Sequence, residues 1–181
     1  MKGVIFNALE DFTDQNFGED QFQGVVDSVD LETKEPFVGP GTYPDGDLLK
    51  IVGKILEVKS LKLDWALREF GKFLFPKLIS INESYAKDSK GIIDFLQRVD
   101  SIIHIEVKKL FPGAVTPTFI YSDITENSLK IKYISERQFC FLMEGLILGA
   151  SEYFNEPIEY EQIECHHTDK TEHCLFQITK I

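Results

Sequence analysis

The chain carries little positive charge. Lys and Arg number 19 against 30 Asp and Glu, which gives a formal net charge of −11 at pH 7. A protein that binds nucleic acid usually presents a concentrated positive field to the phosphates. The acidic balance therefore argues against nucleic acid as a partner, and it disfavours an anionic membrane surface for the same reason.

Long apolar runs and cysteines are also scarce. The longest apolar stretch, Phe139 to Ala150, is interrupted by Glu144 and is too short to cross a bilayer. The N-terminal residues show no long apolar run before a small-residue cleavage site, so we expect no secretory signal. The three cysteines all follow residue 139 and cannot all pair, which favours a reducing compartment. We therefore expect a cytoplasmic protein.

Familiar catalytic motifs are absent from the sequence. There is no glycine-rich phosphate loop, no nucleophile elbow and no paired-carboxylate motif. What the sequence does have is an unusual share of flat side chains, including 15 Phe and 6 Tyr. Such residues fill a large core or line a pocket for a flat apolar ligand. The balance of 43% hydrophobic and 27% charged residues is typical of a globular protein.

Hydrophobic periodicity differs between the first part of the chain and the rest. Apolar residues recur at helical spacing from Val4 to Phe12, from 22 to 29 and after Asp47, with a loop rich in Pro and Gly over 31–47. We expect one α+β domain over 1–181, with a helical portion of about 1–60 and an αβ portion of about 61–181.

The αβ portion is predicted to combine long helices with short alternating strands. The pattern predicts helices over 63–78, with a break or kink at Pro76, over 92–107 and over 136–154. Alternating apolar and polar residues predict strands over 118–121, 128–134, 158–165 and 173–181.

His104 is the only histidine before residue 166, and it lies in a strongly apolar helical segment. A lone histidine in such a place is most often a core-edge residue bonded to a carbonyl. The alternative is an axial ligand that a helix offers to haem iron in an apolar pocket.

Tyr133, Ser135 and Arg137 alternate along a predicted strand and would share one face. Two hydroxyls and a guanidinium suit a pair of carboxylates. Ser135 and Gln138 also match the capping box S-x-x-Q at the start of the next helix. The spacing alone favours the cap.

A third group combines the cysteines with nearby histidines. Thiolates with an imidazole suit tetrahedral zinc. If Cys165 and Cys174 pair across a hairpin, His167 shares their face and is the better fourth ligand, together with Cys140. The alternative is three free buried cysteines beside a polar hairpin tip.

Taken together, these residues resemble the haem-nitric oxide/oxygen binding (H-NOX) family in its bacterial stand-alone form, related to the haem domain of soluble guanylate cyclase. The similarity covers essentially the whole chain. It includes the opening residues 1–11, the segments 70–75 and 103–110, Pro117, Glu144-Gly145-Leu146 and the motif Tyr133-x-Ser135-x-Arg137. The pair of a single helical histidine and a downstream Y-x-S-x-R motif is highly specific to the family.

The resemblance implies a role for each of these residues toward haem b. His104 matches the proximal ligand of the iron. Tyr133, Ser135 and Arg137 match the residues that hold the haem propionates. Ile5 and Pro117 match residues that press on the macrocycle and distort it.

The resemblance also implies which gases bind. Oxygen-binding members supply a distal tyrosine, helped by a polar pair, whereas the matching positions here are Leu142, Leu9 and Leu74. We therefore expect nitric oxide and carbon monoxide to bind, and oxygen not to bind stably. Tyr85 or Tyr153 is the alternative donor if either reaches the pocket.

The cysteine group resembles a zinc site of some bacterial members, with Cys140, Cys165 and Cys174 in matching places. Those members carry a histidine three residues before the middle cysteine, where this chain has Gln162. Either His167 or a neighbouring histidine substitutes, or the site is incomplete.

The resemblance implies a nitric oxide sensor that is not an enzyme. No output module fits beside this domain in 181 residues, so we expect a signalling partner in trans, such as a histidine kinase or a diguanylate cyclase/phosphodiesterase. The alternatives are a haem enzyme such as a peroxidase, an oxygen or redox sensor, and a zinc-stabilised binding module without haem. A peroxidase would need a distal acid–base residue, and none is evident at the matching positions.

Overall fold

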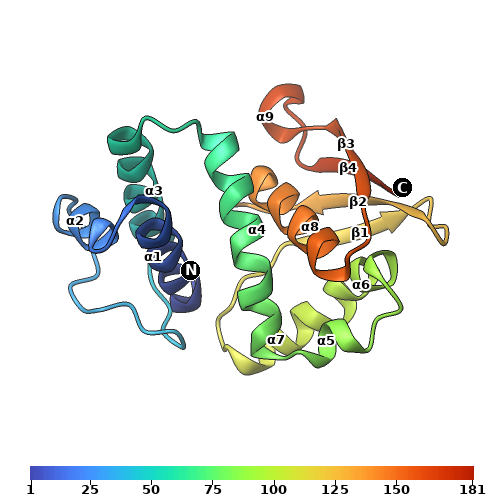
Figure 1. Ribbon diagram of the computed structural model, residues 1–181, viewed down its shortest axis with the longest axis horizontal. Helices are drawn as coiled ribbons and strands as arrows, with labels where there is room; N and C mark the ends of the chain where they lie inside the picture. The colour runs from blue at the N-terminus through green and yellow to red at the C-terminus, as the bar shows by residue number, and fades with distance from the viewer.

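The computed structural model describes residues 1–181 and confirms the predicted α+β class. Figure 1 shows α1, α2 and α3 on one side, α4 and α8 in the middle, and the sheet on the other side. The helices are α1 (Gly3–Phe17), α2 (Gln21–Asp27), α3 (Asp45–Lys59), α4 (Leu63–Ile81), α5 (Ser84–Lys87), α6 (Ile92–Arg98), the π-helical turn η1 (Val99–Ile103), α7 (His104–Leu110), α8 (Cys140–Phe154) and α9 (His166–Asp169). The strands are β1 (Thr118–Ser122), β2 (Ser128–Ile134), β3 (Ile158–Glu164) and β4 (Cys174–Lys180).

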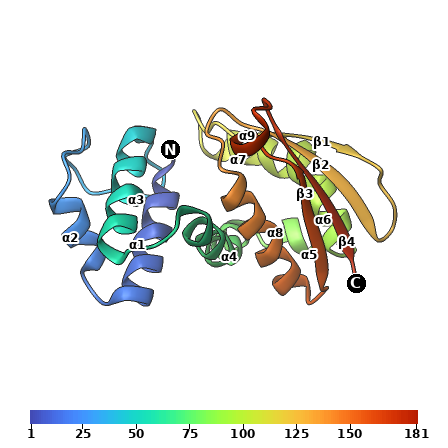
Figure 2. The same cartoon turned by 90° about the horizontal axis from the view of Figure 1, so that it is seen from above.

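The four strands form one antiparallel sheet in the order β1-β2-β4-β3. Strand β2 alternates between buried residues (Leu129, Ile131 and Tyr133) and more exposed ones that include Lys130 and Lys132. Successive side chains of a strand point to opposite faces, so this alternation buries one face of the sheet. Figure 2 shows α8 running along one face of the sheet, between the sheet and α4.

Helices α4 and α8 approach each other at glycines. A Cβ atom on Gly71 would lie 2.6 Å from the carbonyl oxygen of Leu142, and one on Gly145 would lie 2.2 Å from that of Arg68. Only glycine permits backbones this close. The contact fixes α8, and with it Leu142 and Leu146, against the side of α4.

The buried residues gather in two clusters that meet at α4. One joins α1, α2 and α3 to Phe70 and Leu74, and the other joins the sheet, α6 and α8 to Phe75 and Ile79. Helix α4 therefore contributes to both cores.

Two details of the predicted secondary structure are wrong, and one of two alternatives at Pro76 is settled. The helix predicted over 92–107 is divided into α6, η1 and α7. Helix α4 continues through Pro76 to Ile81, so it does not break at the proline. The capping box at Ser135 does not form, because α8 begins only at Cys140 and no side chain caps it. The Ser135 hydroxyl instead accepts a hydrogen bond from the backbone N–H of Arg137 at 3.2 Å.

None of the helices combines the length and the apolar character needed to cross a bilayer.

Candidate functional site

A cavity of about 460 Å³ lies between the N-terminal helices and the αβ portion. Most of its wall is hydrophobic, and it is bounded by α1, α3, α4, α6, α7, α8, the loop before β1 and strands β1 and β2. Its volume falls in the range that small-molecule and cofactor sites occupy. Among the few polar side chains on the wall are His104, Ser135 and Arg137, all three of which were candidates from the sequence.

His104 is the first residue of α7 and lines the cavity with a side chain that is 14% exposed. Its ring lies beside Phe119 at 5.2 Å between centroids. Burial lowers the pKa of His104, and this outweighs the opposing effect of Asp100. A neutral imidazole keeps a free nitrogen lone pair, which is the form that binds metal.

The second ring nitrogen of His104 faces a carboxylate that the sequence analysis missed. Nδ1 lies 3.3 Å from Oδ1 of Asp100, one helical turn earlier. The same oxygen accepts the backbone N–H of Phe119 at 3.1 Å, which fixes Asp100 between α7 and β1. An Nδ1–H donated to Asp100 leaves the lone pair of the imidazole on Nε2, which is the usual arrangement of a metal-binding histidine.

The π-helical turn η1 places Asp100 and His104 at this junction. A π-turn inserts extra backbone into a helix and is frequent at functional sites. It separates α6, which packs in the core, from α7, none of whose residues is buried. The spacing of Asp100 and His104 by one helical turn is the feature of the sequence from which this contact could have been predicted.

Tyr133, Ser135 and Arg137 all line the cavity, although only Tyr133 belongs to β2. Tyr133 is 5% exposed, and burial raises the pKa of its hydroxyl above the usual value. The structure thus brings the three predicted side chains to the same cavity.

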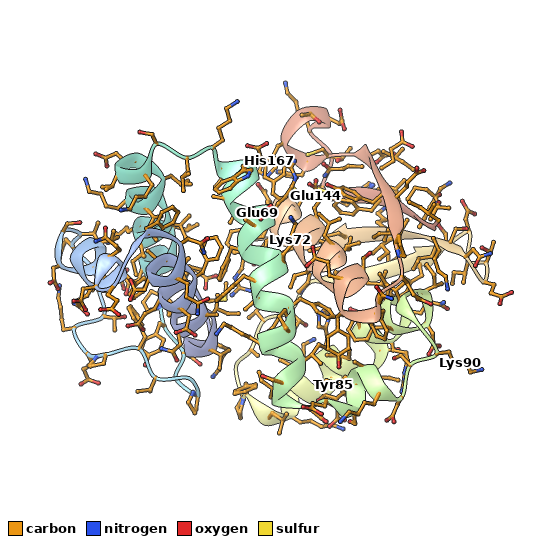
Figure 3. The ribbon with its side chains drawn as sticks, viewed as in Figure 1. Glu69, Lys72, Tyr85, Lys90, Glu144 and His167 are labelled. Atoms are coloured by element: carbon orange, nitrogen blue, oxygen red, sulfur yellow. The ribbon has the colours of Figure 1, made fainter.

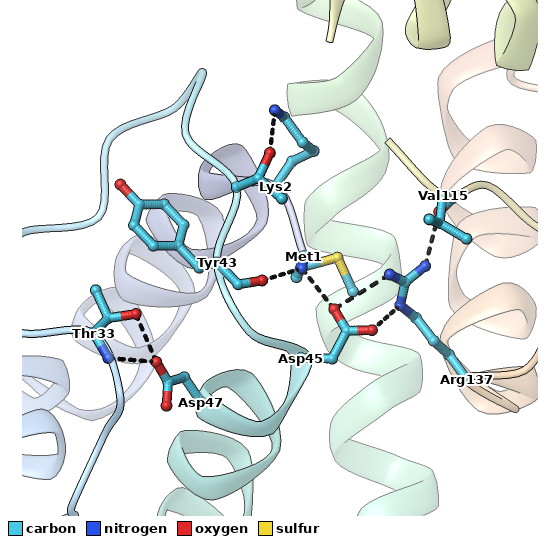
Figure 4. A network of polar contacts seen from close by, with 9 residues as sticks. Met1, Lys2, Thr33, Tyr43, Asp45, Asp47, Val115 and Arg137 are labelled. Atoms are coloured by element: carbon cyan, nitrogen blue, oxygen red, sulfur yellow. Dashed lines mark hydrogen bonds and ion pairs between the residues drawn. The ribbon is translucent and has the colours of Figure 1, made fainter. Parts of the chain in front are cut away.

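The guanidinium of Arg137 binds Asp45 at the start of α3 (Figure 4). Nε donates to Oδ2 at 2.6 Å and Nη2 to Oδ1 at 3.2 Å, while Nη1 donates to the carbonyl of Val115 at 2.8 Å. The amino group of Met1 donates to the same carboxylate at 2.5 Å. Burial raises the pKa of Asp45, but the bonds from Arg137 and Met1 outweigh it and hold the pKa below its usual value.

The remaining cavity candidates divide into two groups. Ile5, Leu74, Pro117 and Leu142 line the cavity. Leu9 does not; it is buried against Phe12 and Phe70 in the N-terminal core instead.

Comparison with known proteins identifies the family. A family model described as Haem-NO-binding matches residues 2–162. The chain belongs to the haem-NO-binding family. No curated protein gives a significant match.

Solved structures of H-NOX proteins match over the full length of this chain. The S. oneidensis protein in its Fe(II)NO state has a TM-score of 0.92 at 26% identity, covering 100% of this chain and 99% of the other. The unliganded Fe(II) protein from K. algicida has a TM-score of 0.88 at 26% identity, covering 100% and 97%. The Shewanella woodyi protein, bound to IWP-051 in the Fe(II)CO state, has a TM-score of 0.85 at 32% identity, covering 100% and 95%. The chain is thus a haem-based gas-binding sensor domain.

The cavity also holds two hydroxyls without hydrogen-bond partners, those of Tyr85 and Thr116. Tyr85 lies on α5 and is 9% exposed (Figure 3). Tyr153, the other tyrosine considered as a ligand donor, is 44% exposed and does not line the cavity. Tyr85 is therefore the tyrosine to test as a donor.

A cluster of cysteines lies where α8 begins. The sulfur atoms of Cys140, Cys165 and Cys174 lie within 4.8 Å of one another, and none forms a disulfide. Burial, reinforced by the two neighbouring thiols, raises the pKa of Cys140 to about 12. Three sulfur atoms that converge in this way suit a thiophilic cation, whose positive charge would stabilise their thiolate forms.

The structure does not bring His167 to these thiols. Its Nε2 lies 3.1 Å from the carbonyl oxygen of Gln138, and its ring stacks on Phe141 at 5.6 Å between centroids. The guanidinium of Arg68 lies over the same Phe141 ring, with its Cζ 5.2 Å from the ring centroid. Figure 3 shows His167 beside the first turns of α4.

Proposed function

We propose that the chain binds haem b in this cavity, with His104 as the only protein ligand to the iron, and that it senses nitric oxide. The observation that carries the proposal is the geometry of His104. Its side chain lies in the wall of an apolar cavity with only 14% of it exposed, burial favours its neutral form by lowering its pKa, and Asp100 faces its other ring nitrogen. Ferrous haem, when bound, supplies the site at which a diatomic gas attaches.

Polar residues at one edge of the cavity suit the haem carboxylates. We propose that Tyr133, Ser135 and Arg137 hold the two propionates, as their exposure to the cavity supports. The guanidinium keeps its charge at every working pH and binds carboxylates through parallel N–H bonds. Ile5 and Pro117 lie on the cavity wall, where they would contact the macrocycle.

The cavity supports nitric oxide and carbon monoxide as ligands in preference to oxygen. With haem in this cavity, stable oxygen binding would need a hydrogen-bond donor on the cavity wall, whereas nitric oxide binding would not. Leu74 and Leu142 offer none, and an unpaired polar atom in a dry pocket forfeits roughly 1–3 kcal/mol, or about a tenfold to hundredfold loss of affinity.

Absorption spectra of the ferrous protein test this preference. Nitric oxide and carbon monoxide are expected to shift the Soret band, and air is expected to give no stable oxygen-bound spectrum. Leu142→Tyr is expected to gain one, with Leu49→Tyr on α3 as the control, because Leu49 lines the cavity but is 56% exposed. A stable oxygen spectrum in the unmodified protein, lost in Tyr85→Phe, would show that the Tyr85 hydroxyl is the donor and would overturn the proposed selectivity.

Asp100 is proposed as a positioning residue for His104. A carboxylate at Nδ1 orients the ring and raises its basicity, and removing such a partner typically costs about 10–100-fold in metal affinity. Asp100→Asn keeps an oxygen for the Phe119 N–H but removes the charge. We expect the iron–histidine stretching band in resonance Raman spectra to move to lower frequency.

The matched control for this effect is Asp94→Asn. Asp94 lies on the neighbouring helix α6 and accepts the backbone N–H of Lys90 at 2.9 Å, away from the cavity wall. If both variants leave the stretching band in place, Asp100 does not act through His104.

Two contacts support a route for the signal. Asp100 joins His104 to β1, and Arg137 joins the loop before Pro117 to α3. A change in how His104 is held would move α7 and the Pro117 loop, and Arg137 would pass that shift to the helical portion of about 1–60. The portion of about 61–181 carries the proposed iron ligand His104 and the proposed propionate-binding residues.

The proposed output is regulation of a separate signalling protein, either a histidine kinase or a diguanylate cyclase/phosphodiesterase, rather than catalysis by the chain itself. Helix α7 supports this role because Ile105, one residue after His104, is 47% exposed. We also propose a structural zinc ion at Cys140, Cys165 and Cys174, and a cytoplasmic location, since three reduced thiols suit a reducing compartment.

A further inference from the structure

Gln162 on β3 buries one end of its side-chain amide without a hydrogen-bond partner. The buried atom is assigned as Nε2. Leaving an amide unpaired away from water is costly, so buried amides are nearly always bonded. An unpaired amide in this place is compatible with a ligand that is not part of the polypeptide.

The sheet register places Gln162 near the three thiols. Gln162 pairs with Phe176 on β4, and Cys174 lies two residues earlier on the same face of that strand. Diagonal neighbours of this kind lie about 7–8 Å apart between backbones, which a long side chain spans. The strand is irregular between Gln162 and Glu164, directly before Cys165.

The three nearby histidines are engaged elsewhere. His167 binds the carbonyl of Gln138, and Nε2 of His173 lies 2.8 Å from Glu164. His166 reaches the cluster only through its backbone N–H, which donates to Sγ of Cys174 at 3.3 Å. No imidazole nitrogen belongs to the group of converging ligand atoms.

We propose that the amide oxygen of Gln162 is the fourth ligand of a zinc ion held by Cys140, Cys165 and Cys174. The two ends of an amide are nearly identical in shape, so rotation by 180° turns the oxygen into the buried position. Three thiolates and one oxygen complete a tetrahedron, and the thiol protons leave to solvent as zinc binds. The inference rests on the proposed zinc site and is independent of the haem.

Zinc K-edge X-ray absorption of the haem-loaded, full-length protein tests the ligand set, because the iron does not absorb at that edge. We expect three sulfur atoms at about 2.3 Å and one oxygen at about 2.0–2.2 Å. An imidazole would add the characteristic multiple scattering of its rigid ring, which an amide does not give. Ring scattering would overturn the proposal, and so would a site with sulfur ligands alone.

Competition with a chromophoric zinc chelator tests Gln162 itself. Gln162→Ala is expected to weaken zinc binding by at least about tenfold, and Gln162→His to restore or exceed the original affinity. His167→Ala is expected to change nothing. Gln177→Ala is the matched control, since Gln177 lies on the opposite face of the sheet and binds the carbonyls of Leu129 and Ile178.

The outcomes separate the two proposals. A loss of affinity in His167→Ala, with Gln162→Ala unaffected, assigns the fourth ligand to His167 and contradicts ours. Failure of the unmodified protein to bind zinc contradicts both the zinc site and the role of Gln162, while the Soret band of the same sample reports the haem separately. If Gln162→Ala does not fold, loss of zinc affinity in the isosteric Gln162→Met decides the question.

Discussion

Replacing His104 with glycine is expected to abolish the native haem spectrum. His167 is the one other histidine on the cavity wall, and its ring stacks on Phe141 of α8, away from α7. If His104 holds the iron as proposed, its removal would leave the haem without a protein ligand. Free imidazole fits the space that the side chain leaves, so adding it to the His104→Gly protein is expected to restore the Soret band.

The control for this variant is His173→Gly. His173 is also partly buried, with 21% of its side chain exposed, but it pairs with Glu164 on the sheet outside the cavity. Its removal is expected to leave the haem spectrum unchanged. An unchanged spectrum in His104→Gly would show that a different residue holds the iron.

Adding one methyl group at Gly145 is expected to destabilise the fold by roughly 3 kcal/mol, a large effect for a single substitution. The new Cβ would lie 2.2 Å from the carbonyl oxygen of Arg68 and 2.8 Å from Cα of Gly71, and both are backbone atoms of α4. Neither can move without separating the helices. Urea unfolding of Gly145→Ala, followed by circular dichroism, measures the loss.

Gly53→Ala is the matched control for Gly145→Ala. Gly53 lies inside α3, is exposed, and has no atom within 4 Å of the position that a Cβ would take. Alanine there is expected to stabilise the protein by about 0.5–1 kcal/mol, because glycine is the poorer helix former. Equal effects at the two positions would contradict the close packing of α4 on α8.

The sheet could be predicted because its pattern is local. Strand β2 has the predicted bounds of 128–134, since Lys130 and Lys132 alternate with buried residues along it. The division of the helix at 92–107 could not be predicted. Every residue of η1 is compatible with an α-helix, and it is the contact of Asp100 with Phe119 of β1 that accompanies the π-turn.

The candidate site was predictable where a motif carried it. His104, Tyr133, Ser135 and Arg137 all line one cavity, and the resemblance had implied each of them. The partner of Arg137 was not predictable, because Asp45 lies 92 residues away at the end of a loop rich in Pro and Gly. Leu9 shows the opposite limit: its apolar character suits a cavity wall and a helical core equally, and the fold places it in the core.

Titration of the haem-free protein with haem, followed by absorption of the ferrous form, tests the central claim most directly. We predict a Soret band that saturates at one haem per chain and shifts when nitric oxide is added. The same titration of His104→Gly is predicted to give that band only with imidazole present. A titration that does not saturate, or that proceeds equally well without His104, would contradict a haem site built on this histidine.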